Sequence, residues 1–339
     1  MGRKKVLLEH TIVIAEAGVN HNGDIAIAKK LIDKAKEAGA DIVKFQTAKV
    51  DSLVSKHAKM AQYQKENLGV EKSQKEMLES LILPFDAFTE LSEYCSKVGI
   101  EFLSTPFDIE SIRFLCRLGC RTWKVPSGEI TNYPYLIEIA RTGKPVILST
   151  GMSTMDEVRD CYELLTKNGS PEVTLLHCTT QYPTDYEDVN LRAMITLQKE
   201  FGCKVGYSDH TRGIIVPVAA VAMGASVIEK HFTLDRNMEG PDHKASLEPE
   251  ELKQMVSSIR HIEASLGDGV KNPKSIEEPN KAVARKSIVA KKDIKKGETL
   301  SEDNVTTKRP GTGVNPMLWR TVIGTKAIRD FEEDELIEI

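Results

Sequence analysis

The chain has 339 residues, of which 40% are hydrophobic and 28% are charged, a balance typical of a soluble globular protein and not of a disordered one. Its 46 basic and 50 acidic residues leave a net charge of −4, which excludes a strong field for nucleic acid or an anionic membrane. Residues 1–9 carry only a short apolar run and no stretch approaches the roughly 20 apolar residues of a membrane span, so we expect a cytoplasmic protein.

Short β-branched runs alternate with longer segments of helical period, which is the pattern of βαβ units. The predicted strand and helix pairs are 12–15 with 25–38, 41–45 with 84–98, 100–104 with 108–118, 122–125 with 133–141, 145–149 with 154–167, 173–177 with 190–200, 204–207 with 213–222, and 226–231 with 248–265. An open doubly wound sheet usually stops at five or six strands. Eight consecutive units therefore predict an α/β fold of the TIM (β/α)8 barrel type.

The pattern is interrupted once and changes after the eighth unit. Residues 47–83, which include a Lys- and Gln-rich stretch, separate the second strand from its helix, and an insertion there lies on the catalytic face and could act as a lid. After a barrel at 1–267, residues 268–282 are polar and rich in turn formers, which predicts a linker. A small β-rich domain is expected at 283–339. Its β-prone pieces are 287–290, 322–324 and 336–337.

Polar and ionisable residues gather where the predicted strands end, the face that carries TIM-barrel active sites. They are Glu16, Asn20, His21, Lys44, Gln46, Thr105, Lys124, Ser127, Glu129, Ser149, Thr150, His177, Thr179, Thr180, Tyr182, Ser208, Asp209, His210, Glu229, Lys230 and His231. A buried lysine is costly without an anion, so Lys44 and Lys124 with the nearby hydroxyls predict a pocket for a phosphate and a carboxylate. Alternatively, the lysines pair with Glu16 and Glu129 in a purely structural network.

A metal site is predicted at the ends of the last two strands. His210 and His231 follow adjacent strands, so their imidazoles could bind one divalent cation and leave positions open for water and substrate. A single histidine there is more often only hydrogen-bonded, but a pair flanked by Asp209 and Glu229 favours the metal. His177 is either a third ligand or a hydrogen-bond partner of a ligand, and the sequence leaves this open.

Two further residues are interpreted from their place in the pattern. Asp242 lies in the loop after the last strand, where it could reach substrate hydroxyls or the waters of a metal, although the segment that follows would also serve as a helix cap. Trp123 precedes Lys124, so strand alternation points it away from the lumen. We expect Trp123 to pack under a helix and not to bind sugar.

An ordered series of motifs resembles the sialic acid synthase (NeuB) family over nearly the whole chain. The matching runs are Ile14-Ala-Glu-Ala-Gly-Val-Asn-His-Asn-Gly, Val43-Lys-Phe-Gln, Phe102-Leu-Ser-Thr-Pro-Phe, Lys124-Val-Pro-Ser-Gly-Glu, Leu148-Ser-Thr-Gly-Met, His177-Cys-Thr-Thr-Gln-Tyr-Pro, Gly206-Tyr-Ser-Asp-His-Thr, Ile228-Glu-Lys-His-Phe-Thr and Gly240-Pro-Asp-His. The tail, with Lys291-Lys-Asp-Ile-Lys-Lys-Gly-Glu and Lys308-Arg-Pro-Gly, resembles the antifreeze-like (SAF) domain of the same family.

The resemblance implies a transferase that condenses phosphoenolpyruvate with the open-chain aldehyde of an N-acetylated mannose-type sugar. The products would be a nine-carbon 2-keto acid and phosphate, and the cofactor would be Mn²⁺, with Mg²⁺ or Co²⁺ as alternatives. By motif position, His210 and His231 would hold the metal. Phosphoenolpyruvate would be bound by Lys44, Lys124, Ser127, Ser149, Thr180, Ser208 and Lys286. Contacts to the sugar or to the attacking water would come from Glu16, Asp242, Tyr182 and Glu229.

Two positions qualify this comparison with the family. Where some neuraminate synthases carry Asn, this chain has Thr180, whose shorter side chain changes the reach of one phosphate contact. Arg309 corresponds to the arginine that the SAF domain of the opposite subunit places over the sugar N-acetyl group. The resemblance therefore implies a homodimer with shared sites.

Several functions remain to be distinguished by experiment. The first expectation is an N-acetylneuraminate synthase that uses N-acetylmannosamine. One alternative is a legionaminic acid synthase that uses 2,4-diacetamido-2,4,6-trideoxymannose, and another is a barrel aldolase with a Schiff base on Lys44 or Lys124. A carbohydrate- or ice-binding protein is suggested only by the tail, and such a protein would not need a barrel lined with lysines and histidines.

Overall fold

The computed structural model describes residues 10–55, 58 and 73–339, and its chain divides into two compact units between Asp268 and Gly269. The expectations for residues 1–9, and for the part of the proposed lid at 56–57 and 59–72, lie outside the described residues. In residues 10–55 and 73–339, none of the helices combines the length and apolar character that crossing a bilayer requires.

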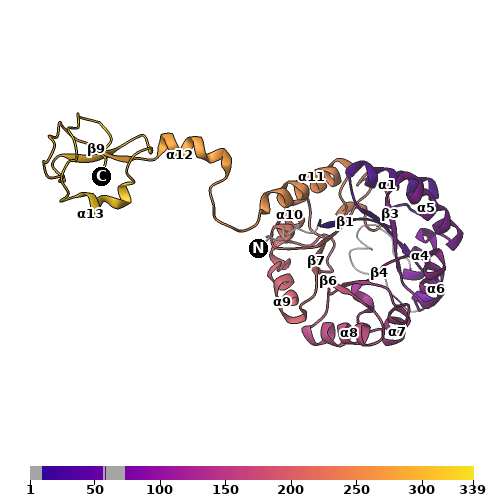
Figure 1. Cartoon of the computed structure of the whole chain (residues 1–339). Helices are drawn as coiled ribbons and strands as arrows, with labels where there is room; N and C mark the ends of the chain where they lie inside the picture. The colour runs from indigo at the N-terminus through magenta and orange to yellow at the C-terminus, as the bar shows by residue number, and fades with distance from the viewer. Residues whose placement is uncertain (1–9, 56–57, 59–72) are drawn as a thin grey trace. The chain divides into compact units, whose positions relative to one another are not determined.

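Within the described residues, the first unit contains eight parallel strands surrounded by a ring of helices (Figure 1). The strands are β1 (Ile12–Gly18), β2 (Ile42–Thr47), β3 (Glu101–Pro106), β4 (Trp123–Val125), β5 (Val146–Ser149), β6 (Val173–His177), β7 (Val205–Asp209) and β8 (Val227–His231). They pair in the order β3-β2-β1-β8-β7-β6-β5-β4, and the terminal strands β3 and β4 contact each other. The predicted TIM barrel is confirmed.

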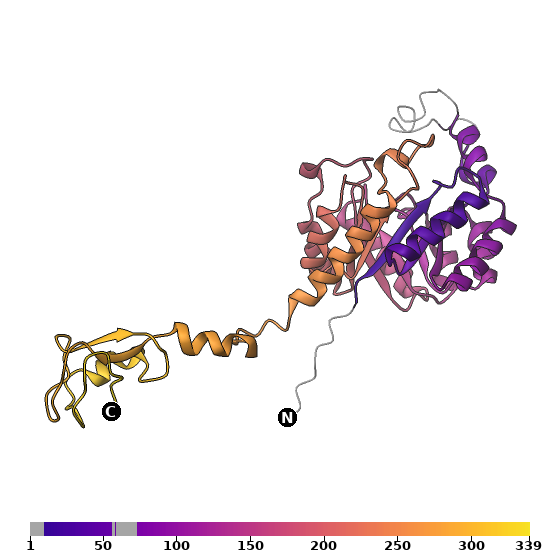
Figure 2. The same cartoon turned by 90° about the horizontal axis from the view of Figure 1, so that it is seen from above.

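In the described residues, each strand is followed by a helix that packs on the outside of the barrel, and α2 (Val50–Leu53) and α4 (Gln74–Leu81) lie between β2 and its outer helix. The outer helices are α1 (Ile25–Ala38), α5 (Phe85–Val98), α6 (Ile109–Leu118), α7 (Tyr133–Arg141), α8 (Met155–Lys167), α9 (Arg192–Phe201), α10 (Ile215–Ala222) and α11 (Pro249–Leu266). Their ends carry expected signals, such as the Asp24 side chain that caps α1 and the capping box of Thr154 and Glu157 on α8. Helices α1 and α11 pack side by side, so the first and the last strand–helix pair of the barrel are in contact (Figure 2).

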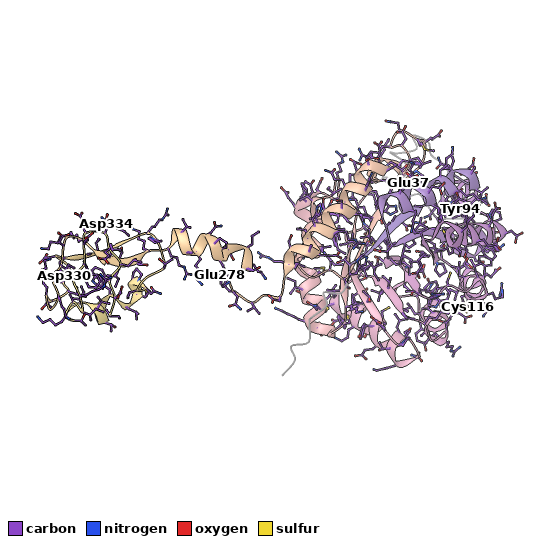
Figure 3. All side chains as sticks on the ribbon, turned by 45° about the horizontal axis from the view of Figure 1, so that its top comes forward. Glu37, Tyr94, Cys116, Glu278, Asp330 and Asp334 are labelled. Carbon is purple, nitrogen blue, oxygen red and sulfur yellow. The ribbon has the colours of Figure 1, made fainter. Side chains whose placement is uncertain are left out.

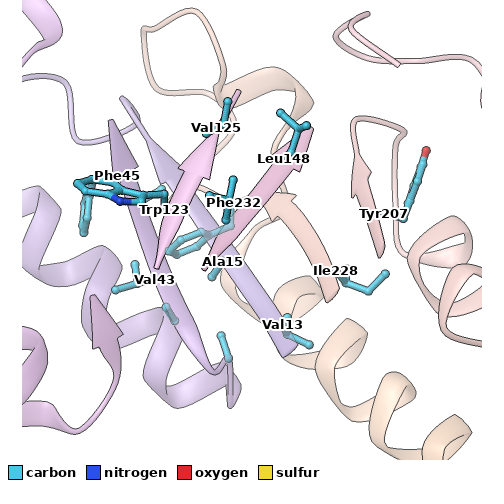
Figure 4. Packing of buried hydrophobic residues seen from close by; sticks show 14 of the residues in the cluster. Val13, Ala15, Val43, Phe45, Trp123, Val125, Leu148, Tyr207, Ile228 and Phe232 are labelled. Carbon is cyan, nitrogen blue, oxygen red and sulfur yellow. The ribbon is translucent and has the colours of Figure 1, made fainter. Parts of the chain in front are cut away.

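Strand alternation separates an outer core from a lumen. Outward-facing residues such as Val43, Val125 and Leu148 pack under the helices, with Trp123 fully buried among them (Figure 4). The indole Nε1 of Trp123 donates to Thr142 Oγ1 at 2.7 Å, which confirms its predicted outward direction. The lumen has its own apolar layer. That layer consists of Ile14, Ile42, Leu103, Ile147, Leu176 and Val227. Polar residues follow two positions later on most of these strands, so the apolar layer supports the polar floor of the site.

Gly206 allows this apolar layer to close. A Cβ at this position of β7 would lie 2.3 Å from the Val227 carbonyl oxygen and 2.7 Å from Leu176 Cδ2. Because backbone cannot move away cheaply, we expect Gly206→Ala to lower the free energy of unfolding by about 3 kcal/mol. Urea denaturation checks this. Gly128→Ala is the control, because its Cβ would meet nothing within 4 Å, and equal stability of the two variants would contradict the expectation.

The second unit has its own small core and is described by itself. It contains α12 (Glu278–Ala284), the antiparallel pair β9 (Ser287–Ala290) and β10 (Val305–Lys308), and the short helix α13 (Trp319–Val322). Its surface carries ion pairs, among them Lys308 with Asp334. Asp334 is labelled in Figure 3. The strand predicted at 287–290 is confirmed.

The linker expected at 268–282 stays a prediction, and its last residues lie in α12, where Pro279 occupies the first turn and its missing N–H costs nothing. One prediction for this part of the chain was wrong. The β-prone run at 322–324 is not a strand, and its first residue, Val322, is the last residue of α13. Val322 is fully buried in the core of the second unit, so its burial and not its β-propensity decides its conformation.

Candidate active site

A cavity of about 490 Å³ lies at the carboxyl ends of the barrel strands. Every site residue predicted within the barrel lines it. These residues are Glu16, Lys44, Lys124, Ser127, Ser149, Thr180, Tyr182, Ser208, His210, Glu229, His231 and Asp242. Lys286 and Arg309 belong to the second unit. The barrel thus brings together residues separated by more than 200 positions in the chain.

The floor of the cavity is a network of buried charges. Lys44 Nζ lies 2.6 Å from Glu16 Oε2 and 3.6 Å from Glu229 Oε2, and it donates to Thr105 Oγ1 at 3.0 Å. Lys124 Nζ donates to Ser149 Oγ at 2.7 Å and lies 3.6 Å from Glu229 Oε1. Glu229 is thus placed between the two ammonium groups, and it accepts a hydrogen bond from Ser208 Oγ at 3.1 Å.

This network corrects one part of the structural alternative stated from sequence. The pairing of Lys44 with Glu16 is confirmed, but the carboxylate beside Lys124 is Glu229 and not Glu129. Glu129 lies in a 3₁₀ turn after β4, where its carboxylate accepts from Asn132 Nδ2. The turn carries it past the strand end, out of reach of the floor.

Burial and charge set different pKa values for the two carboxyls of the floor. Burial raises the pKa of Glu16 to about 7. Burial alone would also raise the pKa of Glu229, but Lys124 and Lys44 lower it to about 2. At neutral pH Glu229 is therefore fully ionised while Glu16 is partly protonated. Burial also lowers the pKa of Lys124, so an anion beside this side chain stabilises its charged form. A multiply charged anion is the natural partner for the two lysines.

Small residues and hydroxyls surround this floor. The Ser127 hydroxyl accepts a hydrogen bond from the Gly151 N–H at 2.9 Å and lies 3.3 Å from Cys178 Sγ. A Cβ at Gly151 would lie 2.7 Å from Thr180 Cγ2 and 3.0 Å from Ser127 Oγ. Glycine at this position therefore lets the loops after β4, β5 and β6 approach one another. The methyl group of Thr180 fills the space beside Gly151.

His210 and His231 lie together above the floor. Their ring centroids are 5.8 Å apart, and the ring of Tyr182 lies 4.1 Å from that of His210. His210 Nδ1 is 2.6 Å from the Thr179 carbonyl oxygen, so Nδ1 carries the proton and Nε2 keeps a lone pair. Burial lowers the pKa of both imidazoles, which keeps them neutral. Nδ1 of His231 is buried with no hydrogen-bond partner in the described part of the chain.

Two neutral imidazoles on one wall fit a divalent cation such as Mn²⁺. Among the described residues, no group of three or more His, Cys, Asp or Glu side chains is arranged to hold a metal. A metal bound by His210 and His231 would therefore keep most of its coordination positions for water and substrate oxygens, as a Lewis acid requires.

Other polar residues at the strand ends face away from the lumen. His177 Nε2 lies 2.7 Å from the Val189 carbonyl oxygen, and the ring lines a separate cavity between β6 and α9. His177 is therefore not among the residues that line the cavity with His210 and His231. Asp209 and Lys230 form a fully buried ion pair on the outer side of the barrel. Asp209, which adjoins His210 in the sequence, does not line the active-site cavity.

The sequence interpretation missed the apolar side of the cavity. Helix α4 (Gln74–Leu81) presents Met77 and Leu81 to Val19 of the loop after β1, and these side chains line the cavity. Ser73 and Glu76 form a capping box at the start of α4. That box, followed by apolar residues four positions apart, is the signal that could have identified the helix.

The comparisons with known proteins agree with this geometry. Residues 31–271 match the model of the NeuB family, and residues 285–338 match that of the SAF domain. An N,N'-diacetyllegionaminic acid synthase of Campylobacter jejuni is 52% identical over 332 residues, which cover 97% of this chain and 99% of that protein. An N,N'-diacetyllegionaminic acid synthase of Legionella pneumophila is 50% identical over 318 residues, which cover 93% and 89%.

A solved structure extends this comparison. The N-acetylneuraminic acid (sialic acid) synthetase of Leptospira borgpetersenii is 35% identical and superposes with a TM-score of 0.70, covering 80% of this chain and 90% of that one. The family match spans most of the barrel, including its lysines and its histidine pair. The chain therefore belongs to the NeuB family and is a phosphoenolpyruvate-condensing synthase of nonulosonic acids.

Proposed function

We propose that this enzyme condenses phosphoenolpyruvate with 2,4-diacetamido-2,4,6-trideoxymannose, giving N,N'-diacetyllegionaminic acid and phosphate. The sequence alone favours N-acetylmannosamine as the acceptor, with this diacetamido sugar as the alternative. Relatives that are 50% and 52% identical are synthases of N,N'-diacetyllegionaminic acid, whereas the sialic acid synthetase of known structure is 35% identical. The observation that carries the proposal is the apolar side of the cavity.

This apolar wall consists of Val19, Met77, Leu78, Leu81 and Ile82. The trideoxy sugar offers a 6-methyl group and a 4-acetamido methyl group, where N-acetylmannosamine offers hydroxyls. A hydroxyl buried against such a wall without a partner costs about 1–3 kcal/mol, whereas a methyl group gains from the same contact. The wall therefore favours the diacetamido sugar over the hydroxylated one.

The residues of the floor then take the role of binding phosphoenolpyruvate. Lys44 and Lys124 would pair with its phosphate and carboxylate, and hydroxyls would complete the contacts. The hydroxyls are those of Ser127, Ser149, Thr180 and Ser208. Because Lys124 already donates to Ser149, the ammonium group is held in place before the anion arrives. Lys286 of the second unit is proposed to add a further positive charge.

The chemistry joins the enol carbon of phosphoenolpyruvate to the aldehyde carbon of the sugar. His210 and His231 would hold the divalent cation, which when bound supplies Lewis-acid polarisation of the aldehyde oxygen. A water adds to the carbon that carries the phosphate, and the bond from this carbon to the phosphate oxygen breaks as the 2-keto group forms. Of the two protons that the water loses, one passes to the new alkoxide and the other to the departing phosphate. Burial raises the pKa of Glu16 to about 7 and that of Asp242 to about 6, so both carboxyls can exchange protons near neutral pH.

Tyr182 and Glu229 have different parts in this scheme. The ring of Tyr182 packs on both histidines, 4.1 Å from the ring of His210 and 5.8 Å from that of His231. This packing fixes the orientation of the two imidazoles. Glu229 stays ionised between Lys44 and Lys124 and orients their ammonium groups. We propose that both contact the bound substrates through these positions.

The active enzyme is proposed to be a homodimer in which the SAF domain of each subunit covers the site of the other. Arg309 would then contact the sugar N-acetyl group. This proposal rests on the SAF domain match and on the family resemblance. Mixing Arg309→Ala subunits with His231→Ala subunits tests it, because heterodimers with shared sites contain one fully intact site. Failure of the mixture to recover activity would refute the arrangement.

The acceptor is tested by steady-state phosphate release with each sugar in turn. We expect kcat/KM for 2,4-diacetamido-2,4,6-trideoxymannose to exceed that for N-acetylmannosamine by about 100-fold or more, since several groups of the sugar contribute to discrimination. Equal values, or a preference for N-acetylmannosamine, would refute the proposed acceptor while leaving the reaction class intact.

Met77→Asn tests the apolar wall directly. Met77 is 3% exposed and lines the cavity, so an amide there places polar atoms against the methyl groups of the preferred sugar. We expect kcat/KM for the diacetamido sugar to fall about 10-fold while that for N-acetylmannosamine changes less than about 3-fold. The ratio of the two values in one variant serves as its own control for folding. A parallel fall for both sugars would show that the wall does not select the acceptor.

A further inference from the structure

The Asn-His-Asn-Gly sequence after β1, at residues 20–23, has no role in the chemistry described so far. Its Asn20 is 1% exposed, and Asn20 and Asn22 do not line the active-site cavity. Both asparagines contact the loop after β8, which carries Asp242. These contacts suggest that residues 20–23 hold the loop that carries Asp242.

Asp242 depends on its main chain for its position. Its side chain lines the cavity and is 9% exposed, and within the described residues no group donates a hydrogen bond to its carboxylate. Its carbonyl oxygen, in contrast, accepts from Ser246 Oγ at 2.7 Å and from the Ala245 N–H at 3.2 Å. The direction of the carboxylate is therefore set by the fold of residues 242–246.

Asn20 holds that fold from the opposite side. Its Nδ2 donates to Ser246 Oγ at 3.0 Å and to the Phe232 carbonyl oxygen at 2.9 Å. A carbonyl oxygen can only accept, so the contact with Phe232 fixes the orientation of the amide. Ser246 is 2% exposed and uses its hydroxyl both to accept from Asn20 and to donate to Asp242. A continuous path of buried hydrogen bonds thus joins β1 to the backbone of Asp242.

Asn22 makes a second attachment to the same loop. Its Nδ2 donates to the Glu239 carbonyl oxygen at 2.9 Å, which leaves Oδ1 to accept from His243 Nε2 at 3.2 Å. His243 is fully buried, and its Nδ1 lies 2.6 Å from Thr233 Oγ1. A Cβ at Gly240 would lie 2.5 Å from His243 Cδ2, so the loop closes tightly over this contact.

We infer that Asn20 and Ser246 are positioning residues that aim the Asp242 carboxylate at the acceptor sugar. The inference rests on the proposed role of Asp242 and extends it to residues that touch neither substrate. The loop after β1 also contributes Val19 to the apolar wall, and a Cβ at Gly23 would lie 2.8 Å from the Ser80 carbonyl oxygen of α4. The same short loop therefore contributes to the apolar wall and is joined, through Ser246, to the main chain of Asp242.

Ser246→Ala and Asn20→Asp test the inference in the full-length enzyme. Ser246→Ala removes the hydroxyl without adding volume, and Asn20→Asp keeps the shape but removes both N–H donors. We expect each to lower kcat about 10-fold with the diacetamido sugar, while the Kd of phosphoenolpyruvate, measured by calorimetry without acceptor, stays within 2-fold. Asn168→Asp is the matched control, because Asn168 Nδ2 donates to the Leu164 carbonyl oxygen at the exposed end of α8.

A double-mutant cycle separates positioning from general loosening of the barrel. If Asn20 and Ser246 act through Asp242, their effects disappear in an Asp242→Ala background. Equal losses in both backgrounds, or phosphoenolpyruvate affinity that falls together with kcat, would overturn the inference. Should Asp242→Ala leave too little turnover to compare, the split between unchanged phosphoenolpyruvate Kd and lowered kcat decides alone. Near-normal activity of Asp242→Ala would instead refute the proposed role of Asp242, so the two failures are distinguishable.

Discussion

Lys124→Met is expected to lower kcat/KM for phosphoenolpyruvate by about 10³-fold. Lys124 is 2% exposed and donates to Ser149, so the ammonium group enters the floor already oriented for an anion. Removing one partner of a buried, hydrogen-bonded charge pair costs about 3–5 kcal/mol, and each 1.4 kcal/mol is tenfold. Met has a similar length and needs no counter-ion, so we expect the fold to persist. Phosphate release at saturating acceptor measures the change.

The matched control for this prediction is Lys144→Met. Lys144 donates to the Cys120 carbonyl oxygen outside the cavity, so its replacement should leave the KM of phosphoenolpyruvate unchanged. Calorimetric titration with phosphoenolpyruvate alone separates binding from turnover. If Lys124→Met binds phosphoenolpyruvate within about 3-fold of the wild type, the floor is not the anion site, and its lysines serve only the network with Glu16 and Glu229.

His231→Ala should abolish metal binding and turnover together. With one imidazole of the pair removed, we expect Mn²⁺ affinity to fall by about 100-fold or more and product formation to fall at least as far. Titration calorimetry with Mn²⁺ and phosphate release measure the two effects. His177→Gln is the informative control, because His177 bonds the Val189 carbonyl oxygen outside the cavity and should leave Mn²⁺ affinity unchanged. Unchanged affinity in His231→Ala would exclude this pair as the metal site.

The barrel could be predicted from the sequence because each of its units repeats the same local signals. Buried parallel strands read as short β-branched runs, and amphipathic helices follow them at regular spacing. The residues of the lumen could also be predicted from the sequence, since Lys44, Lys124, Ser208 and Glu229 all come at the ends of such runs. Because TIM-barrel active sites lie at the carboxyl ends of the strands, these residues are predicted to belong to one site.

The sequence does not determine which face of a barrel strand each residue at its end occupies. Asp209 and Lys230 each lie one position from a lumen residue, Ser208 and Glu229, and a shift of one residue moves a side chain to the other face. The sequence does not fix strand register to one residue, so it does not tell which face the residue beside His210 occupies. The structure places Asp209 in a buried pair with Lys230.

Contacts between distant loops were also out of reach. The apolar wall joins Val19 to α4, and the hydrogen bonds of Asn20 reach Ser246, 226 positions away. Nothing in the local pattern of either segment names its partner. The same reason explains why Glu129, rather than Glu229, was paired with Lys124 from sequence: proximity in the chain is a poor guide to proximity across a barrel.

The most direct measurement is one incubation of the wild-type enzyme with phosphoenolpyruvate, 2,4-diacetamido-2,4,6-trideoxymannose and Mn²⁺, followed by mass spectrometry and phosphate determination. The expected result is one phosphate released for each nine-carbon 2-keto acid formed, with turnover abolished by EDTA and unaffected by borohydride. Turnover that persists in EDTA, together with a borohydride-trapped adduct on Lys44 or Lys124, would contradict metal-assisted condensation and identify a Schiff-base aldolase.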